Sequence, residues 1–373
     1  MADKLERVDL VPPDKLKGLF GSYYPPPEPV PHFINQKLEE IYPVNRVHVI
    51  VNPFAGQKKG KHLASLLASD LDQSRIKSVI HFTEYVNHAE ELVSKLEFVE
   101  GDALMSVGGD GTISEIITGL LKRNDSFSNN IPLSIVPAGS GNSQANDMQI
   151  ADYLDALQRL TTGKLQKMDI GKVTFFNDGK KQVRYTHNLV GWGLGVDANI
   201  LAEKMRFLGP MRYDIGSLMS IIRGKVRKAK CYVDGNLIDS SFILLLIQNT
   251  KTGGDRLTLA PMAHVDDGKM DLGVIYHISR FQVLKLFNQL KASGSHVWNP
   301  NVEYYRFKNL IIEKKLLDAR NLWFMLKTKT VPSLENFKPD LNFALVVGAE
   351  QYGISDDWFA SNHVSLNLSL IHI

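Results

Sequence analysis

Apolar residues follow two different periods in the first part of the chain. Four short apolar runs predict buried β-strands, at residues 46–51, 78–83, 103–107 and 132–136. Between these runs, apolar positions at helical spacing predict helices, at 61–71, 88–96 and 113–121. Strands that alternate with helices of this length are typical of a parallel, doubly wound α/β sheet. Ligands of such sheets bind beyond the carboxyl ends of the strands.

The pattern changes near residues 161–163. Further apolar runs predict strands separated by turns, at 168–174, 183–189, 230–234, 241–249 and 269–276. One helical stretch, at 198–225, interrupts them. We therefore expect a second, mostly antiparallel, β-sandwich-like domain. The predicted organisation is a Pro-rich lead at 1–44, an α/β domain at 45–163, a β-rich domain at 164–313 and an atypical segment at 314–373.

The Pro-rich lead has little periodicity. Residues 23–31 read Tyr-Tyr-Pro-Pro-Pro-Glu-Pro-Val-Pro, which is typical of a stiff, polyproline-like segment. We interpret it as an extended spacer, and the alternative is a docking ligand for a partner.

Composition excludes several classes of protein. The chain has 373 residues, of which 44% are hydrophobic and 22% charged, as in soluble globular proteins. Its single cysteine, Cys231, excludes an internal disulfide framework and a Cys-rich zinc site. No run of 18 apolar residues predicts a membrane span, and no secretory signal is visible. The net charge of +3 is too small to indicate a nucleic-acid partner. We expect a cytoplasmic protein.

The strongest local signal follows the third predicted strand. Residues 108–112 read Gly-Gly-Asp-Gly-Thr, and a predicted helix follows. Glycines let the backbone approach a ligand closely, and the free N–H groups of a helix start can hold phosphate. Thr112 and Glu115 have the spacing of a capping box at that start. An aspartate among glycines suggests work on a metal or a proton, or a tight turn.

Two further loops also follow predicted strands. Residues 52–60 read Asn-Pro-Phe-Ala-Gly-Gln-Lys-Lys-Gly, and residues 137–143 read Pro-Ala-Gly-Ser-Gly-Asn-Ser. The first is not a Walker A loop, because only three residues separate Gly56 from Gly60 and His62 follows Lys61. Phosphate contact through backbone N–H groups and lysines is one interpretation, and a solvated basic turn is the other.

Together, the three loops resemble the nucleotide-binding blocks of the diacylglycerol kinase and sphingosine kinase superfamily. Residues 192–197, 203–213 and 261–268 are similar to the sphingosine and ceramide kinase branch, so the resemblance covers about residues 46–312. It implies ATP as the phosphate donor. The nucleotide-binding residues that it implies are Asn52, Pro53, Gly56, Lys58, Thr83, Gly108, Gly109, Gly111, Thr112, Gly139, Ser140, Gly141, Asn142, Arg206 and Arg212.

The same resemblance implies phosphorylation of a lipid hydroxyl with Mg²⁺ on the phosphates. Asp110 matches the aspartate that accepts the hydroxyl proton or organises the metal. Asp267 matches a metal-associated position, although a turn aspartate before Gly268 explains it nearly as well. We expect ATP and Mg²⁺ as cofactors.

The substrate is expected near Asp197, Asn199 and Glu203. Sphingosine kinases carry an aspartate at the position of Asn199, and an amide cannot pair with an ammonium as a carboxylate does. A sphingoid base is our first expectation, and ceramide or diacylglycerol is the alternative. NAD kinase shares the Gly-Gly-Asp-Gly-Thr loop but not the blocks at 139–142 and 206–213. A lipid-binding pseudokinase stays open, because the family's late Asp-Gly-Glu strand motif is missing.

The segment 204–230 holds eight Lys or Arg and one acidic residue, so its net charge is 8 − 1 = +7. Apolar residues interleave with these cations, which suits an anionic membrane surface. A core-facing stripe with a solvated basic face is the alternative. We expect a lipid substrate at a membrane surface and a peripheral location there, and we keep a homodimer open.

Residues 344–355 read Ala-Leu-Val-Val-Gly-Ala-Glu-Gln-Tyr-Gly-Ile-Ser, and Asp357-Trp358 follows. This resembles a cofactor-loop motif of SpoU-type RNA methyltransferases. The segment is too short for that enzyme, so we interpret it as a chimeric transcript or a wrong gene model joined near 313–320. The alternative is a chance match in an ordinary terminal strand and loop. Such a join would leave an exposed strand edge in the second domain.

Overall fold

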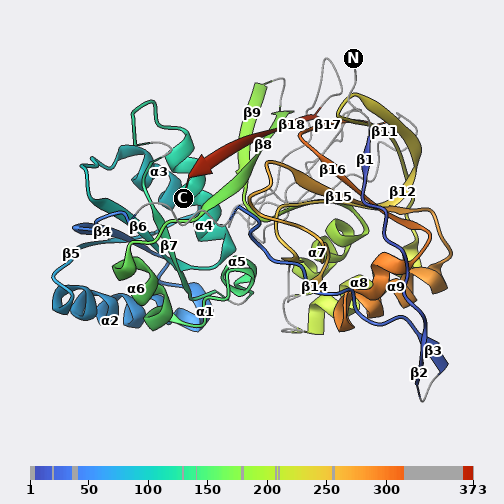
Figure 1. The fold of residues 1–373 in the computed structure, drawn as a ribbon, viewed down its shortest axis with the longest axis horizontal. Coiled ribbons are helices and arrows are strands. Elements are labelled where there is room, and N and C mark those ends of the chain that lie inside the picture. Colours follow the sequence, from blue (N-terminus) through green and yellow to red (C-terminus); the bar gives the residue numbers. More distant parts are fainter. Residues whose placement is uncertain are drawn as a thin grey trace.

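The computed structural model describes residues 5–18, 21–35, 41–127, 130–139, 141–177, 180–205, 208, 211–253, 257–314 and 364–372. These residues form two domains that lie side by side (Figure 1). One is built on a parallel sheet and the other on an antiparallel sheet, as predicted.

The first domain contains a four-stranded parallel sheet in the order β5-β4-β6-β7. Its strands are β4 (Arg46–Val51), β5 (Lys77–Phe82), β6 (Asp102–Gly108) and β7 (Leu133–Pro137). β4 is the first strand of this sheet; β5 pairs with one of its edges and β6 pairs with the other. The direction in which successive strands are added to the sheet therefore reverses between β4 and β6. The loops after β4 and β6 therefore face each other at the carboxyl edge, where α/β sheets bind ligands.

Helices cover both faces of this sheet. They are α1 (Ala55–Lys58), α2 (Gly60–Gln73), α3 (His88–Lys95), α4 (Asp110–Leu121), α5 (Ser143–Asp147) and α6 (Tyr153–Thr162). On α2 the buried residues recur at helical spacing, since Gly60, Ala64, Leu67 and Leu71 face the sheet. The strand and helix predictions for this domain are confirmed to within three residues.

The second domain holds a ten-stranded antiparallel sheet in the order β1-β16-β15-β12-β11-β17-β18-β8-β9, with β10 paired to β12. The strands are β1 (Glu6–Arg7), β8 (Lys167–Asn177), β9 (Lys180–Thr186), β10 (Leu189–Gly193), β11 (Arg227–Val233), β12 (Asn236–Gln248), β15 (Met270–Tyr276), β16 (Val302–Phe307), β17 (Asn309–Lys314) and β18 (Val364–His372). Small hairpins β2–β3 (Leu16–Gly18, Gly21–Tyr23) and β13–β14 (Thr252–Gly253, Leu257–Thr258) lie outside it.

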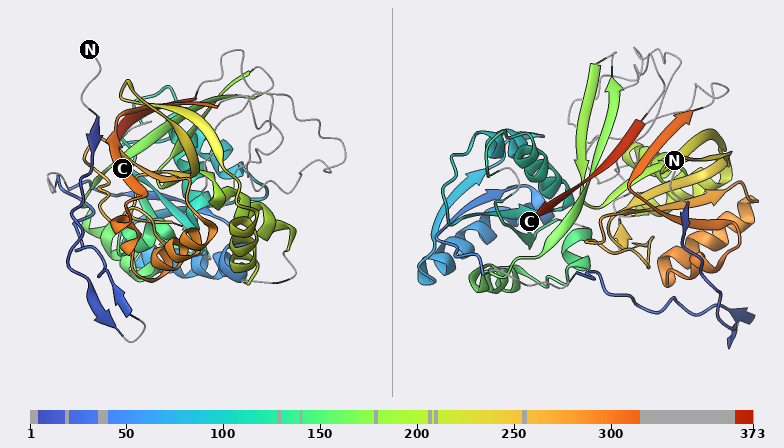
Figure 2. Two further views of the ribbon diagram at one scale, coloured as in Figure 1. Left: turned by 90° about the vertical axis from the view of Figure 1, so that its right-hand side faces the viewer. Right: turned by 45° about the horizontal axis from the view of Figure 1, so that its top comes forward.

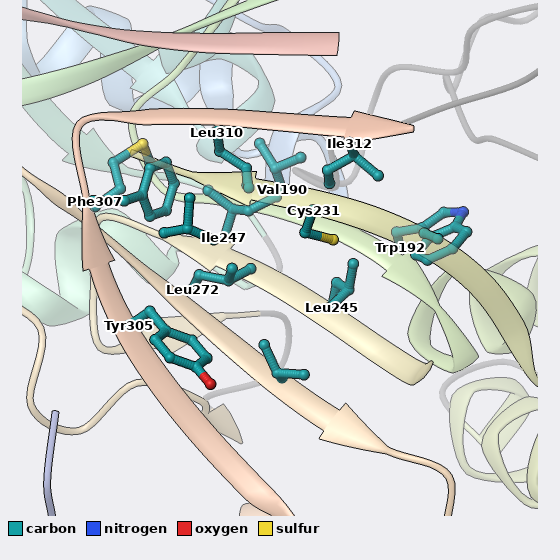
Figure 3. Close-up of a cluster of buried hydrophobic side chains, with 14 of the residues drawn as sticks. Val190, Trp192, Cys231, Leu245, Ile247, Leu272, Tyr305, Phe307, Leu310 and Ile312 are labelled. Carbon is teal, nitrogen blue, oxygen red and sulfur yellow. The ribbon is translucent and has the colours of Figure 1, made fainter. Parts of the chain in front are cut away.

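The inner face of this sheet forms a continuous apolar core. Phe242, Leu245 and Ile247 of β12 are fully buried. Cys231 and Leu272 from the neighbouring strands pack in the same cluster (Figure 3). Burial raises the pKa of the Cys231 thiol to about 12, so this single cysteine is a core residue without thiolate character at neutral pH.

Two predictions for this domain were wrong in detail. In place of one helix at 198–225 there are two, α7 (Leu194–Lys204) and α8 (Met211–Arg223). In place of one strand at 183–189 there are β9 and β10. A further helix, α9 (Arg280–Ala292), escaped prediction, although Ser279 and Gln282 form a capping box that signals its start.

The Pro-rich lead is extended, as expected, but it is not a free spacer. It runs along the second domain and crosses toward the first (Figure 2). β1 pairs with β16, the Trp298 indole donates to the Pro25 carbonyl at 2.9 Å, and the Val265 amide donates to the His32 carbonyl. We call residues 25–35 the strap.

The strand edge expected from a foreign C-terminal segment is not exposed. β18 lies between β17 and β8 and pairs antiparallel with both. The edges of β17 and β8 are therefore covered, which is how sheets avoid edge-to-edge association. The motif at 344–358 lies outside the described residues.

Candidate functional site

The three glycine-rich loops converge at the carboxyl edge of the parallel sheet. A Cβ on Gly56 would lie 2.2 Å from the Ala138 carbonyl oxygen, and one on Gly139 would lie 2.5 Å from the Gly109 Cα. No side chain fits at these distances, so glycine is required for the loops to touch. The amides of Ala138 and Gly139 both donate to the Gly108 carbonyl. The three loops therefore lie together at this edge, and nucleotide binding by them stays a prediction.

Asn142 closes the loop after β7 upon itself. Its Oδ1 accepts the Gly139 amide at 2.7 Å, and its Nδ2 donates to the Gly139 carbonyl at 2.9 Å. Its backbone is left-handed, with φ of 52°, which asparagine tolerates better than most residues. In this structure Asn142 shapes the loop, and its side-chain amide is committed to that task.

Asp110 is buried and lies at the first position of α4. Its two carboxylate oxygens accept the backbone amides of Ser143 and Gln144, each at 2.9 Å. The carboxylate therefore bridges the start of α4 and the start of α5, where the partial positive charges of both helices favour an anion. Each oxygen keeps a second lone pair for a further proton or cation.

The predicted capping box at Thr112 and Glu115 was wrong. α4 begins at Asp110, three residues earlier than that pattern requires, so Glu115 lies in its second turn. The Glu115 carboxylate instead accepts the amides of Asn87 and Ala89, at 3.0 and 3.1 Å, and so holds the start of α3. Thr112 packs against Gly108, whose added Cβ would lie 2.3 Å from its Oγ1.

Other predicted nucleotide residues lie at the same edge. Asn52 follows β4, and its Oδ1 accepts the Phe54 amide; Pro53 is half-buried beside it. Thr83 follows β5 and donates its amide to the Val51 carbonyl.

Ser140 and Arg206 lie outside the described residues, as do the side chains of Lys58 and Glu203. Arg212 lies on α8, where its guanidinium stacks on Tyr213.

The predicted substrate residues lie on α7 in the second domain. Asp197 forms a buried ion pair with Arg227, at 2.7 and 2.8 Å, and Arg227 also lies over the Trp192 ring. Asn199 is exposed. A cavity of about 90 Å³ lies beside Asp197, between α7 and α8, lined by Asp197, Ile200, Leu201, Lys204, Ser220, Arg223 and Lys225. Its mixed apolar and cationic walls suit a small polar group on an apolar body.

The contacts of Asp267 favour the interpretation as a turn residue over a cation site. Its Oδ1 accepts the Lys269 amide at 3.0 Å, and its Oδ2 lies 3.9 Å from the Arg306 Nε. A Mg²⁺ or Ca²⁺ ion at this carboxylate would need further oxygen ligands, whereas the group that lies next to it is the cationic side chain of Arg306. Within the described part of the chain, no group of three His, Cys, Asp or Glu side chains could hold a metal ion.

Sequence reasoning missed His187, between β9 and β10. It is buried beside Asp110, and burial lowers the pKa of its imidazole to about 4 despite the nearby carboxylate. The imidazole is therefore neutral at pH 7. A single histidine in a turn between two strands belongs to no periodic pattern, so the sequence gives no signal for it. Its burial near Asp110 depends on how the two domains pack together.

Gly139→Ala tests whether loop contact is required for nucleotide binding. The added methyl would collide with Gly109 and Asn142, so the loops must separate. We expect ATP affinity to fall at least tenfold, measured by titration of the purified chain. Gly191→Ala is the matched control, since its Cβ meets only ordinary contacts, the nearest at 3.6 Å. Equal ATP affinity in both variants would contradict the prediction.

Comparison with known proteins agrees with this geometry. Residues 46–173 match the family model of the diacylglycerol kinase catalytic domain, and residues 188–325 match that of the YegS C-terminal NAD kinase beta sandwich-like domain. The second match runs past residue 313 and gives the chain an ordinary second domain of this kind. The SpoU-type interpretation of the C-terminal segment is therefore not supported.

Individual relatives point the same way. Sphingosine kinase 1 of Arabidopsis thaliana is 26% identical over 75% of this chain and 66% of its own length. Sphingoid long chain base kinase 4 of Schizosaccharomyces pombe is 30% identical over 71% of this chain and 66% of its own length. This chain therefore spans about two thirds of each. A putative diacylglycerol kinase structure from Bacillus anthracis shares the fold, with a TM-score of 0.59 and 20% identity over 88% of this chain and 95% of that one.

Proposed function

We propose that the chain transfers the γ-phosphate of ATP to the hydroxyl of a sphingoid base, because its residues 46–173 match the family model of the diacylglycerol kinase catalytic domain. The observation that carries the proposal is the contact between the three glycine-rich loops at the switch point of the parallel sheet. The sphingoid base as substrate rests on the two relatives named for sphingosine and sphingoid bases.

The loops supply the phosphate site. Backbone amides of close-packed glycines and the start of the 12-residue helix α4 favour anionic oxygens. The described residues offer no cluster of metal ligands, so we propose that Mg²⁺ arrives on the phosphates of ATP. When bound there, Mg²⁺ neutralises charge that develops on the transferred phosphoryl group.

Asp110 would accept the proton of the attacking hydroxyl. It is the one carboxylate in the three loops, and the amides of Ser143 and Gln144 hold it in a fixed orientation. A base held this way needs no reorganisation when the hydroxyl arrives within hydrogen-bond distance. The proton would bind one of the remaining lone pairs.

A neutral lipid, such as ceramide or diacylglycerol, is the second candidate. The Asp197 carboxylate is already paired with Arg227, and the exposed side chain at position 199 is an amide. Neither offers an uncompensated carboxylate to a sphingoid ammonium, whereas a neutral headgroup needs none.

Label transfer from γ-labelled ATP tests the proposal. The panel is sphingosine, ceramide, diacylglycerol and monoacylglycerol, with NAD included, and the chain is run beside Asp110→Ala. Asp110-dependent label in sphingosine supports the proposal, and label only in a neutral lipid moves the assignment to the second candidate. A folded chain that binds ATP but labels nothing contradicts both and supports a pseudokinase.

We further propose that α8 and α9 rest on an anionic membrane. Exposed apolar side chains lie along both helices, at Met211, Leu218, Ile222, Phe281 and Leu284. Arg223, Arg280 and Lys285 flank them, and Arg280 packs against Gly224 at the end of α8. The two helices lie along one border of the second domain (Figures 1 and 2). No helix in the described part of the chain is long and apolar enough to cross a bilayer.

Phe281→Asp tests this membrane face. Phe281 is 80% exposed, so the change should leave folding intact while removing apolar area worth about 2 kcal/mol in a bilayer. We expect binding to phosphatidylserine vesicles, measured by sedimentation, to fall at least tenfold. Leu237→Asp is the control, because Leu237 is 52% exposed on β12, away from the two helices. Equal losses in both variants would argue against the face.

A further inference from the structure

A short helix, α5, lies at the junction of the two domains (Figure 1). Its first turn is fixed by Asp110, which accepts the amides of Ser143 and Gln144. Gln144 is fully buried, and its Nε2 donates to the Met168 sulfur of β8 at 3.1 Å. Thus α5 touches the phosphate loops at one end and the second domain along its side.

The last residue of α5, Asp147, is bonded to the second domain. Its Oδ1 accepts the Thr252 hydroxyl at 2.7 Å, and its Oδ2 accepts the Thr252 amide at 3.0 Å. Asp147 is only 3% exposed. A buried carboxylate with two hydrogen bonds to one residue is costly to displace, because separation would leave its charge uncompensated.

A third segment meets this contact. The Lys251 ammonium, buried next to Thr252, donates to the Val30 carbonyl of the strap. Burial lowers the pKa of both Lys251 and His32, and the nearby Asp147 carboxylate opposes part of that lowering. Asp266 accepts the amides of Ile34 and Asn35, which fixes the strap a few residues later.

We infer that Asp147 is a positioning residue for phosphoryl transfer, which holds the lipid-binding domain against the helix that Asp110 caps. This inference rests on the proposed function, because it assigns ATP to the loops and the lipid to the second domain. In-line transfer needs the hydroxyl and the phosphate placed to a fraction of an ångström, and an error of about 1 Å can cost about a hundredfold in rate. With the two reactants on different domains, the Asp147–Thr252 contact sets that placement.

Asp147→Asn is the first test. The asparagine keeps an oxygen for the Thr252 hydroxyl but presents N–H to the Thr252 amide. We expect kcat for lipid phosphorylation to fall ten- to a hundredfold, while ATP affinity, set by the first domain, changes less than twofold. Asp155→Asn is the matched control, since it removes an ion pair with Arg159 inside the first domain only. A kcat equal to that of the parent chain would overturn the inference.

Thr252 gives the partner test. Thr252→Val removes the hydroxyl donor, and Thr252→Ser restores it. We expect Thr252→Val to lower kcat, Thr252→Ser to retain it, and the double variant Asp147→Asn/Thr252→Val to lose less than the product of the single losses. Parallel losses of kcat, ATP affinity and thermal stability would indicate a merely structural role and would overturn the inference.

A measurement without turnover separates this inference from the proposed function. Cys231 is buried and is the single cysteine of the chain, so spin labels can be placed selectively at Ser69→Cys on α2 and Leu237→Cys on β12. We expect one narrow interdomain distance in the parent and a broader distribution in Asp147→Asn. If the parent chain labels no lipid, the proposed function fails. An unchanged distance distribution in Asp147→Asn would overturn the inference that the Asp147–Thr252 contact holds the two domains together.

Discussion

Asp110→Asn should lower the rate of lipid phosphorylation by at least about a hundredfold, while ATP still binds. A positioned general base contributes about 10²- to 10⁴-fold, and an amide cannot take the proton. The amide oxygen still accepts one of the two α5 amides, so the loop geometry is only half disturbed. Single-turnover phosphorylation and ATP titration on the same preparation measure the two effects.

Asp110→Ala separates the two tasks of this carboxylate. It removes the proton acceptor and both of the hydrogen bonds that Asp110 accepts from the buried start of α5. We expect the same loss of rate plus a fall of about 2 kcal/mol in the free energy of unfolding. Rates within tenfold of the parent in Asp110→Asn would show that Asp110 only caps α5.

Glu115→Ala should be among the most destabilising single changes in the first domain. Glu115 is 6% exposed, and its carboxylate is bonded to the Asn87 and Ala89 amides. Its loss would leave the start of α3 without its acceptor. We expect the free energy of unfolding at pH 5, where the folded Glu115 side chain still holds its proton, to fall by about 3 kcal/mol, measured by urea denaturation. Glu91→Ala on the exposed side of α3 is the control, with an expected change below about 0.5 kcal/mol.

The same carboxylate should make stability depend on pH. Burial raises the pKa of folded Glu115 to about 7 from the ordinary 4.5, so the folded state holds this proton when the unfolded state has lost it. Its contribution to stability therefore falls as pH rises from about 4.5 to 7. Relative to Glu115→Gln, which cannot titrate, the parent should lose about 3 kcal/mol between pH 4.5 and pH 8. A difference that does not change with pH would contradict this.

The parallel sheet and its loops could be predicted from the sequence, because apolar period and glycine position are local signals. The convergence of Gly56, Gly109 and Gly139 also follows, since carboxyl ends of parallel strands share one edge. The hydrogen-bond partners of side chains in other segments could not be predicted from the sequence. Glu115 has the spacing of a helix cap, yet it caps the neighbouring helix, because α4 begins at Asp110 and turns Glu115 toward α3.

Contacts between domains were the least predictable part. Asp147 and Thr252 are 105 residues apart, and neither belongs to a periodic pattern that would single it out. Asp197 was expected to face a substrate, but Arg227, 30 residues later in the chain, pairs with it. A sequence pattern shows which residues can be ionised, whereas the fold decides whether a counter-ion already lies beside them.

The strap and β1 also affect how the protein folds as it is made. Glu6 of β1 lies opposite Arg306 of β16 in the antiparallel pairing, so the paired strands are 300 residues apart in the chain. At synthesis rates of about 5–20 residues per second, β1 waits roughly 15–60 s on the ribosome for its partner. The first domain can fold during that interval, since its sheet uses only nearby strands. β1 is made about 300 residues before its partner strand and is therefore among the last segments to reach its native place, and the junction between the domains closes only after synthesis of the second domain.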